Sequence, residues 1–543
     1  MPKKIGDTLQ NKYKLSRYDW IVLIVILTFF CLNFMTLMAF PTVHSDELWL
    51  KGIATEMLDQ GRFDVTEPFY DLYPRVIHPF RWLYNGLLII ALKIYDPSVV
   101  AVRLVALIFG TLCLPLVYKI TRTQFQNPLY GIAVTTLLCL NIQFVYSVHM
   151  GRQETIILFL LLLGYWWLIK SDTKHLIVKL TLLILLGMGV HPNSFILGIC
   201  FAGLLLLKGI MREAPLSKLF KLLGLSTIGV TFYVLIGTLM NPTFIKGYMN
   251  YGSALGVDAE VTNRFEGFYW YWYKLFHQIG GTYDLFDIKG ALILFVILSL
   301  IWLPILLTVL AKVQLRKTTH FIAIDFYPLI TLTGIALSFL LIGRYNQTAI
   351  VFIMPFVLLL MLQSVDKVMR LTTHKRSPIT LAVLVIILAG LWGSNLWKNL
   401  TDYASHRFYS LSYEDMLKEI SHHLPADAVV LGNLNIIEAF NPNHFYDIRN
   451  LGYLDPSSSA FQEYVESRNI EYIVLHEEMD YIARTSPKWD FLYVNIVYYD
   501  AMQLYLKTHT QRIYAFENPL YAMRISKFSG TYPWQTVIYK VVE

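Results

Sequence analysis

The apolar stretch WIVLIVILTFFCLNFMTLMAF, residues 20–40, decides the class of this protein because it carries no charged side chain. A helix needs about 20 consecutive apolar residues to cross a lipid bilayer, and this stretch meets that length. No small-residue cleavage site follows it, as a removable signal peptide would have. We therefore expect residues 20–40 to form the first transmembrane helix and to stay attached to the chain.

Further apolar runs continue through the first 400 residues. Of the 543 residues, 55% are hydrophobic and only 15% are charged, whereas soluble domains carry about 25% charged residues. The shortest runs lie between residues 155 and 207. Together the runs predict about eleven transmembrane helices, near residues 20–40, 99–120, 129–148, 155–169, 176–190, 194–207, 222–240, 291–311, 326–342, 348–362 and 379–393.

Basic residues gather in short segments between the apolar runs, and they predict the orientation of the chain. The N-terminal tail MPKKIGDTLQNKYKLSR is strongly basic, so the positive-inside rule places it in the cytoplasm. Every second loop after it is also basic: KITRTQFQNP, KSDTKH, KGIMREAPLSKLFK, KVQLRKTTH and DKVMRLTTHKR. The net charge of +7 is thus a topology signal, and we expect no nucleic-acid partner.

The remaining loops, including two long ones at residues 41–98 and 241–289, are then predicted to lie outside. The apolar run 82–94 is too short to span a bilayer, and counting it would reverse every later loop, so we expect a helix along the outer interface. Loop 241–289 contains the aromatic stretch FEGFYWYWYKLF, which predicts either an interfacial belt or a lid. We expect a multi-pass protein of the cytoplasmic membrane.

The chain changes character near residue 398. Residues 1–397 are predicted to form the membrane domain, and residues 398–543 an extracytoplasmic domain. Ser412 followed by Asp415 resembles a capping box that opens a helix, and SSSAFQEYVESR and VYYDAMQLYLKT also predict helices. Short β-branched runs predict strands at AVVLG, EYIVL, YAMRI and TVIYKV. The predicted fold class is therefore a polytopic α-helical membrane protein with a C-terminal soluble α/β domain.

Ionisable residues collect at the predicted outer ends of the spans, where a ring of such groups usually lines a polar cavity. Each has a simpler interpretation by itself. The acidic pair suits a helix start, the arginines suit the headgroup region or a local ion pair, and a His-Pro step suits a helix end. Those interpretations do not explain why acids and bases converge on one face, at Asp46, Glu47, Arg75, His78, Arg103, Arg152, Glu154, His191 and Arg344.

The order of these motifs resembles the GT-C superfamily of membrane glycosyltransferases. Within it the sequence is similar to glycosyltransferase family 39, which includes the protein O-mannosyltransferases, and to the aminoarabinose transferase of lipid A. The family often has HPP where this chain has HPF, and Asp where it has Glu154. The terminal domain does not resemble the repeats of eukaryotic protein mannosyltransferases. The resemblance covers residues 1–400 and is carried by the acidic pair in HSDELW, HPF at 78–80, Arg103, RQE at 152–154, and Arg344–Tyr345 followed by Pro355.

The resemblance implies an inverting transfer of a sugar from a polyprenyl-phosphate donor to a lipid, glycan or protein acceptor on the outer membrane face. It implies Asp46 as the general base, with Glu47 and Glu154 orienting the base or the acceptor. It implies Arg344 as the first cation at the donor phosphate. Further phosphate candidates are Arg103, Arg75 and His78, and secondary candidates are Arg152 and His191.

No cofactor is required, because the energy for transfer arrives in the lipid-linked donor. A divalent metal is compatible with the acid-rich rim, although no ligand spacing of a metal motif appears. No disulfide, zinc site or thiol nucleophile is expected, because every cysteine falls inside an apolar run: Cys31, Cys113, Cys139 and Cys200.

Two other classes of protein compete with this interpretation. A lipid or sugar transporter or flippase also lines its pathway with acids and arginines. Transporters, however, place these groups near the bilayer midplane and in repeated halves, whereas the centres of the spans here are almost free of charge. A receptor that binds through its outer domain would leave the acidic rim without a purpose.

Overall fold

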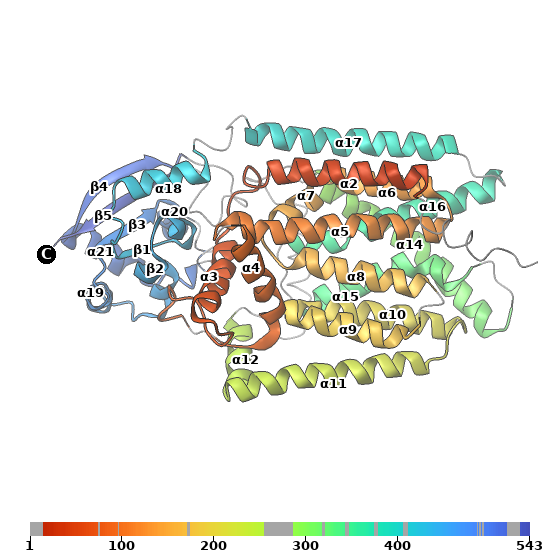
Figure 1. Cartoon of the computed structure of the whole chain (residues 1–543), viewed down its shortest axis with the longest axis horizontal. Coiled ribbons are helices and arrows are strands. Elements are labelled where there is room, and N and C mark those ends of the chain that lie inside the picture. Colours follow the sequence, from red (N-terminus) through yellow and green to blue (C-terminus); the bar gives the residue numbers. More distant parts are fainter. Residues whose placement is uncertain are drawn as a thin grey trace, which may run out of the picture.

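The structure is a computed structural model, and it describes residues 15–73, 76–95, 97–170, 174–254, 286–317, 321–342, 347–373, 378–404, 411–485, 487, 490, 493–518 and 533–542. Long helices run side by side in a bundle, and a small domain that contains a sheet lies at one end of it (Figure 1). We call that end of the bundle the domain end. The predicted fold class, a polytopic helical protein with a C-terminal α/β domain, is confirmed.

Within the described ranges, eight helices are long and apolar enough to cross a membrane, and a ninth span results if α6 and α7, bent by 65°, count as one. Helices α8 and α9 are apolar but shorter. Every predicted run lies on an apolar helix, and the count of eleven spans stays a prediction. The bundle helices are α2 (Arg17–Met35), α5 (Val99–Phe125), α6 (Pro128–Leu140), α7 (Ile142–His149), α8 (Glu154–Ile169), α9 (Leu176–Val190), α10 (Phe195–Ile210), α11 (Ser217–Met240), α14 (Phe286–Gln314), α15 (Tyr327–Ile342), α16 (Met354–Thr373) and α17 (Pro378–Ala404).

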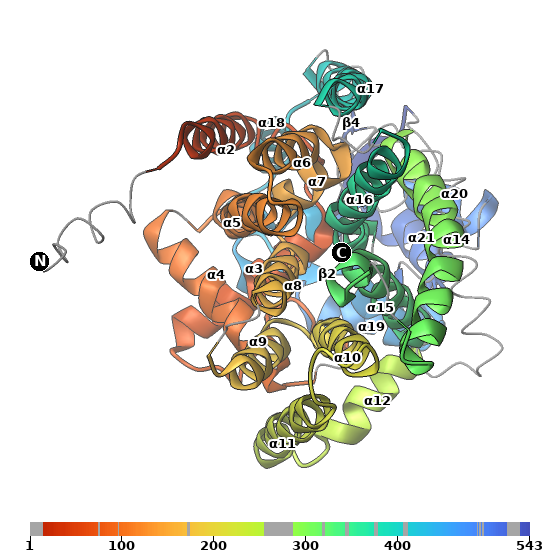
Figure 2. The same ribbon diagram turned by 90° about the vertical axis from the view of Figure 1, so that its right-hand side faces the viewer.

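Apolar side chains are exposed on the outside of the bundle. Seen along its axis, α11, α14 and α17 lie at the periphery (Figure 2). Helix α11 exposes Ile228, Phe232 and Leu239 at 69%, 63% and 85% of their surface. Helix α5, by contrast, packs against α2, α6, α7 and α8 and buries most of its length. Exposed aliphatic groups would be unfavourable in water, so this outer surface is suited to lipid.

Two helices at the domain end are separate from the parallel bundle. These are α3 (Ser45–Gln60) and α4 (Trp82–Ile94), and a short 3-10 turn η1 (Pro79–Arg81) precedes α4. Figure 1 shows them between the bundle and the domain, with α4 running across the direction of the long helices. The run 82–94 is thus a helix outside the bundle, as the sequence predicts, and α12 (Phe244–Ala254) also lies at this end.

The ends of the helices away from the domain carry the basic loops and several ion pairs. Asp19, near the start of α2, accepts hydrogen bonds from Arg122 (2.7 Å) and from the hydroxyl of Tyr118 (2.9 Å). Asp325, in the turn η3 (Ala323–Phe326), lies 3.1 Å from Lys367 of α16. Among the described residues, Arg122 and Lys367 of two basic segments therefore lie at the end of the bundle away from the domain (Figure 1), while the side of the membrane on which that end lies stays a prediction.

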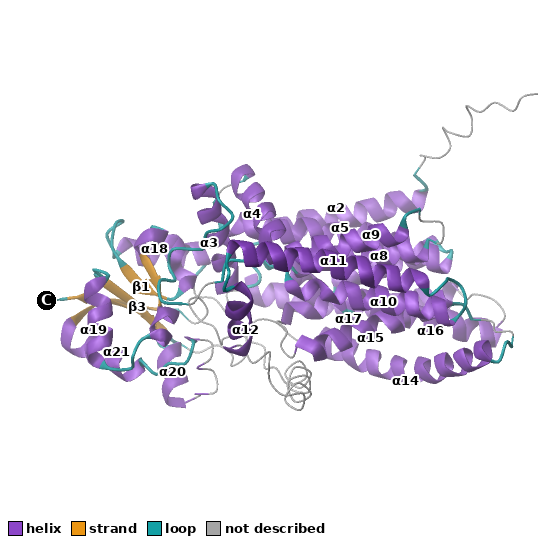
Figure 3. Ribbon diagram, turned by 90° about the horizontal axis from the view of Figure 1, so that it is seen from below, coloured by secondary structure: helices purple, strands orange, loops and turns teal. Residues whose placement is uncertain are grey.

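The C-terminal domain is a five-stranded sheet with helices packed on it, and its strands appear in orange in Figure 3. The strand order is β2-β1-β3-β5-β4; β1 pairs in parallel with β2 and β3, and β5 pairs antiparallel with β3 and β4. The elements are α18 (Tyr413–His422), β1 (Val430–Gly432), β2 (Phe445–Asp447), α19 (Ser458–Ser467), β3 (Tyr472–His476), α20 (Glu478–Thr485), α21 (Tyr499–His509), β4 (Thr510–Glu517) and β5 (Gln535–Val541).

Three of the four predicted strands form β1, β3 and β5, and the fourth, YAMRI, lies outside the described residues. The predicted cap of α18 is confirmed, because the Asp415 amide donates to the Ser412 hydroxyl at 3.1 Å. Strands β2 and β4 were not predicted. Helix α17 continues to Ala404, past the predicted boundary at residue 397.

The domain docks on the loop that carries the acidic pair. The Asn435 side-chain amide donates to the Val43 carbonyl at 3.2 Å, and the Asn450 amide donates to the Phe69 carbonyl at 2.9 Å. Asn435 and Asn450 are both buried, at 2% and 0% exposure. The loop is therefore held from two sides, by the bundle and by the domain.

Candidate active site

The acidic pair lies in the first turn of helix α3, whose start is capped by local side chains. The Glu47 carboxylate accepts from the His44 amide at 2.8 Å, and the His44 ring nitrogen Nδ1 accepts from the Asp46 amide at 3.1 Å. Both acids lie in the first turn, where the helix dipole favours negative charge. The helix-start interpretation is therefore correct for Glu47, which completes a capping box.

Glu47 also forms a buried ion pair with Arg103 of α5. Two parallel hydrogen bonds, each 2.9 Å, join the Arg103 Nε and Nη2 to the two carboxylate oxygens, and both side chains are 0% exposed. Arg103 Nη1 donates to the carbonyls of Leu37 (2.8 Å) and Pro41 (3.0 Å). The interpretation of Arg103 as a lipid-headgroup anchor is thus wrong, because its guanidinium is enclosed and joins α3 and α5 to the segment that follows α2.

The turn between α7 and α8 approaches the same carboxylate. The Gly151 amide donates to Glu47 Oε1 at 2.7 Å, and the Tyr84 hydroxyl donates to the Gly151 carbonyl at 2.9 Å. A Cβ at residue 151 would lie 2.5 Å from the Val102 side chain, so only glycine permits this approach. The turn therefore brings the next residue, Arg152, beside the start of α3.

Arg152 lies between two carboxylates. Its Nη2 is 3.1 Å from Glu154 Oε1, and its Nη1 makes a close ion pair with Asp46 Oδ2. The local Arg152–Glu154 pair is thus present and extends to Asp46. Burial lowers the pKa of Arg152, but the carboxylates of Glu154 and Asp46 outweigh it and raise that pKa above its ordinary value. One permanent cation lets two acids occupy one site.

Asp46 is the most exposed of the three acids Asp46, Glu47 and Glu154. Its side chain is 24% exposed, compared with 6% for Glu154 and 0% for Glu47. Of these three carboxylates, Asp46 therefore has the largest contact with solvent.

His191 follows the end of α9 and lies beside a cation that the sequence analysis missed. Its Nδ1 accepts from the Asn193 amide at 3.1 Å, so the helix-end interpretation is correct. Its Nε2 lies 3.3 Å from Arg81 Nη2, and the Arg81 guanidinium stacks 4.5 Å above the Trp49 ring. Burial, followed by the charge of Arg81, lowers the pKa of His191 well below its ordinary value. Arg81 directly follows the HPF motif, and this position in the sequence could have identified it as a candidate site residue.

The arrangement of the helices and terminal domain matches solved structures of membrane glycosyltransferases. The crystal structure of ArnT from Cupriavidus metallidurans bound to undecaprenyl phosphate has a TM-score of 0.55 and 9% identity to this chain, over 96% of this chain and 98% of ArnT. The apo structure of the same protein has a TM-score of 0.52. The chain has a GT-C fold. The resemblance to this superfamily is thereby confirmed at the level of the fold.

A second GT-C structure supports the same fold. The oligosaccharyltransferase of Archaeoglobus fulgidus, crystallised with a tethered acceptor peptide, has a TM-score of 0.51 and 12% identity, over 95% of this chain and 74% of its own. No protein-family model matches the sequence, and no curated protein does.

Part of the predicted site lies outside the described residues of this GT-C fold: Arg75, Arg344 and the aromatic stretch FEGFYWYWYKLF. His78 is described, and it precedes η1 with its ring 5.8 Å from that of Phe80. Among the described residues, no group of three His, Cys, Asp or Glu side chains could hold a metal ion. The structure thus joins Asp46, Arg152 and Glu154 into one cluster, which we call the acidic cluster, with Glu47 and Arg103 directly behind it.

Proposed function

We propose that this chain is an inverting glycosyltransferase, which moves a sugar from a polyprenyl-phosphate donor to an acceptor on the extracytoplasmic face of the cytoplasmic membrane. The observation that supports the proposal is the acidic cluster, in which Arg152 bridges Asp46 and Glu154 at the domain end of a GT-C fold. The ArnT structure with this fold holds undecaprenyl phosphate, which is a donor carrier of the required class.

Asp46 is the residue to which we assign general-base catalysis. It is the most accessible acid of the cluster, and it would take the proton of the acceptor hydroxyl as the acceptor oxygen bonds to the anomeric carbon. The bond between that carbon and the phosphate oxygen breaks, and its electron pair leaves with the polyprenyl phosphate. A single displacement inverts the configuration, and a positioned base accelerates such a step by roughly 10²–10⁴.

The other residues of the cluster would position Asp46. Arg152 holds its carboxylate, and Glu154 holds Arg152 from the opposite side. Glu47 and Arg103 anchor the start of α3 without access to solvent. We therefore assign Glu47 and Arg103 to positioning, and no longer assign Arg103 to the phosphate, because its donors face Glu47 and two backbone carbonyls.

The leaving phosphate needs cations that meet its growing negative charge. We keep Arg344, Arg75 and His78 as candidates and add Arg81, because Arg81 and His191 lie 3.3 Å apart beside the HPF turn. The reaction requires no cofactor, and the acceptor is a lipid, a glycan or a protein. A transporter is less well supported, because Asp46 lies in the first turn of α3, and Figure 1 shows α3 at one end of the bundle rather than at its middle.

The decisive experiment is Asp46→Asn in the purified full-length chain, assayed by release of polyprenyl phosphate from a labelled lipid-linked sugar. Asn keeps the size of Asp but cannot accept a proton at neutral pH, so we expect at least a ~100-fold loss of turnover with donor binding retained. Asp64→Asn, in an exposed pair with Arg62 of the same loop, is the matched control and should be fully active. Wild-type turnover by Asp46→Asn would refute the assignment.

The nature of the acceptor changes the size of this effect. An acceptor that is already ionised, such as a phosphate or a carboxylate, needs no general base. Asp46 would then only position the acceptor or its sugar, and Asn would lose about 1–3 kcal/mol of charge-assisted hydrogen bonding. The two sizes of loss therefore also distinguish a hydroxyl acceptor from an anionic one.

A further inference from the structure

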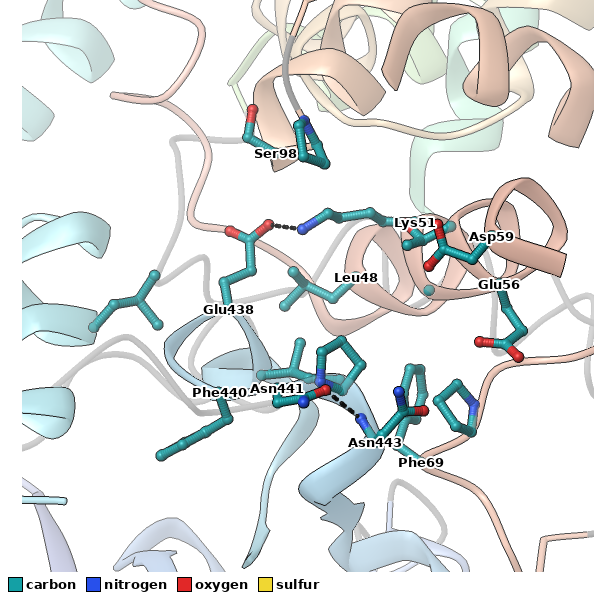
Figure 4. A pocket seen from close by; sticks show the side chains of 17 residues that line it. Leu48, Lys51, Glu56, Asp59, Phe69, Ser98, Glu438, Phe440, Asn441 and Asn443 are labelled. Atoms are coloured by element: carbon teal, nitrogen blue, oxygen red, sulfur yellow. Dashed lines mark hydrogen bonds and ion pairs between the residues drawn. The ribbon is translucent and has the colours of Figure 1, made fainter. Parts of the chain in front are cut away.

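A cavity of about 520 Å³ lies between α3 and the C-terminal domain (Figure 4). Its walls come from α3, from the loop around Phe69, and from the domain segment that follows β1. In Figure 4, Lys51 of α3 and Glu438 of the domain point toward each other across it, and their ion pair is 2.5 Å long. This volume falls in the range of small-molecule sites, which is about 300–1,000 Å³.

The cavity is separate from the acidic cluster. An α-helix turns about 100° per residue, so Leu48, which lines the cavity, lies about 200° around α3 from Asp46. The lining residues Lys51, Thr55 and Asp59 follow Leu48 along the same face. An occupant of the cavity therefore contacts the helix whose first turn carries Asp46, but from the opposite side.

The charges of the lining indicate the kind of ligand. The lining contains three carboxylates and one ammonium group: Glu56, Asp59 and Glu438, and Lys51. This excess of negative charge repels phosphates and other anions, and the charged and amide groups disfavour a hydrocarbon tail. Asn441 and Asn443 line the cavity and are exposed, so their side chains add neutral donors and acceptors at its mouth. Such a lining suits hydroxyl-rich ligands that are neutral or carry amines.

We propose that this cavity is a carbohydrate subsite, which binds a neutral or amine-bearing oligosaccharide segment of the acceptor away from the reacting hydroxyl. The role of the oligosaccharide as acceptor rests on the proposed transferase function. Its binding in the cavity does not. Binding energy from remote parts of a substrate raises the rate at the reacting centre. The C-terminal domain thus supplies one wall of a subsite that selects the acceptor.

The test measures binding of the full-length chain in detergent to an array of immobilised oligosaccharides that are neutral, amine-bearing, carboxylated or phosphorylated. Three proteins are compared: wild type, Asn443→Trp, which places an indole at the cavity mouth, and Glu463→Trp, which places one on an exposed position of α19 outside the cavity. We expect wild type and Glu463→Trp to bind neutral or amine-bearing oligosaccharides, and Asn443→Trp to lose at least ~10-fold of that signal.

Either of two results would overturn the subsite. In the first, wild type and Asn443→Trp bind every oligosaccharide equally well. In the second, their binding differs only for carboxylated or phosphorylated oligosaccharides. A second variant tests the charge argument, because Glu56→Gln with Asp59→Asn should gain binding to carboxylated oligosaccharides; no gain contradicts it. The array contains no donor, so binding to it does not depend on the proposed function. That function fails separately if the wild type releases no polyprenyl phosphate from a lipid-linked sugar.

Discussion

Glu47 and Arg103 are joined by two parallel hydrogen bonds of 2.9 Å, and neither side chain has any exposed surface. The pair connects the first turn of α3 to the first turns of α5. Because the two charges neutralise each other without water, each depends on the other for its place in the fold.

The first prediction follows from that dependence. Removing one partner of a buried ion pair leaves an uncompensated charge and typically costs about 3–5 kcal/mol. Arg103→Met should therefore lower the thermal unfolding temperature of the purified protein markedly. The matched control is Arg62→Met, in an exposed pair with Asp64, which should change little. Wild-type stability of Arg103→Met would show that the pair is not needed for the fold.

The second prediction concerns the bridge between the acids. Arg152→Ala removes the cation between Asp46 and Glu154, so the two carboxylates repel each other and Asp46 loses its position. We expect turnover to fall by ~100-fold or more, with partial recovery in Arg152→Lys, since lysine restores the charge without the planar fork. Turnover assays on both variants provide the check, with Arg468→Ala in the domain as control. Equal rates for alanine and lysine would exclude an electrostatic role.

The third prediction concerns the leaving phosphate. Arg344→Ala should lower the chemical step by roughly 10²–10³, because a preorganised cation at the leaving oxygen is lost, and lysine should rescue it only in part. Single-turnover kinetics separates this step from donor binding. If Arg344→Ala turns over normally, Arg344 is an interfacial anchor and Arg81→Ala becomes the deciding variant.

The fourth prediction concerns orientation. In a chain without its four native cysteines, Gln60→Cys and Ala460→Cys should react with a membrane-impermeant thiol reagent in intact cells. Leu315→Cys, in the basic segment after α14, should react only after the cells are opened. Reaction at position 315 alone would reverse the orientation and remove the extracytoplasmic site with it.

The fifth prediction is a pH dependence of the C-terminal domain. Burial lowers the pKa of His476 to about 4, and its ring accepts from the Glu478 amide at 3.0 Å. The unfolded domain binds a proton below pH 6.5 whereas the folded one does not, so stability falls as pH drops from 6.5 toward 4, by up to about 3 kcal/mol.

Hydrogen exchange of the β3 segment at pH 7 and pH 5 measures this effect. Exchange corrected for its intrinsic pH dependence should be less protected at pH 5 in the wild type. His476→Gln keeps an amide that can accept and donate but has no titrating group, so its protection should not depend on pH over this range. An equal pH response in both proteins would assign the effect to another group.

The sequence predicts the helices well because lipid imposes a minimum apolar length that is visible in one dimension. For the same reason it predicts that Asp46, Arg152 and Glu154 lie near one another at the ends of helices. It does not predict which side chains form ion pairs. Arg103 is expected at the phosphate from the sequence, yet it pairs with Glu47. This pairing depends on how closely α3 and α5 approach each other, which no local sequence pattern indicates. Strands β2 and β4 were missed because β2 has only three residues and because β4 exposes three consecutive residues, at 511–513, so that it lacks the alternation of a half-buried strand.

Arg81 and His149 were missed for a different reason. Neither belongs to an acidic motif, and the role of each becomes visible only from the residue that it contacts in the structure. The His149 ring contacts the Phe40 carbonyl and lies 2.8 Å from Asn33 Oδ1, so it ties the end of α7 to the loop after α2. Such contacts join segments more than 100 residues apart, and nothing in the local pattern encodes them.

The hydrogen bond from Asn435 to Val43 has a consequence for how the protein is made. The two residues are 392 positions apart, and the ribosome adds about 5–20 residues per second. The loop before Asp46 therefore leaves the ribosome roughly 20–80 seconds before its partner in the domain exists. Each new chain thus passes through a stage in which its membrane helices have been synthesised but the loop before Asp46 still lacks its contact with the domain. That contact forms only when the domain folds onto the loop.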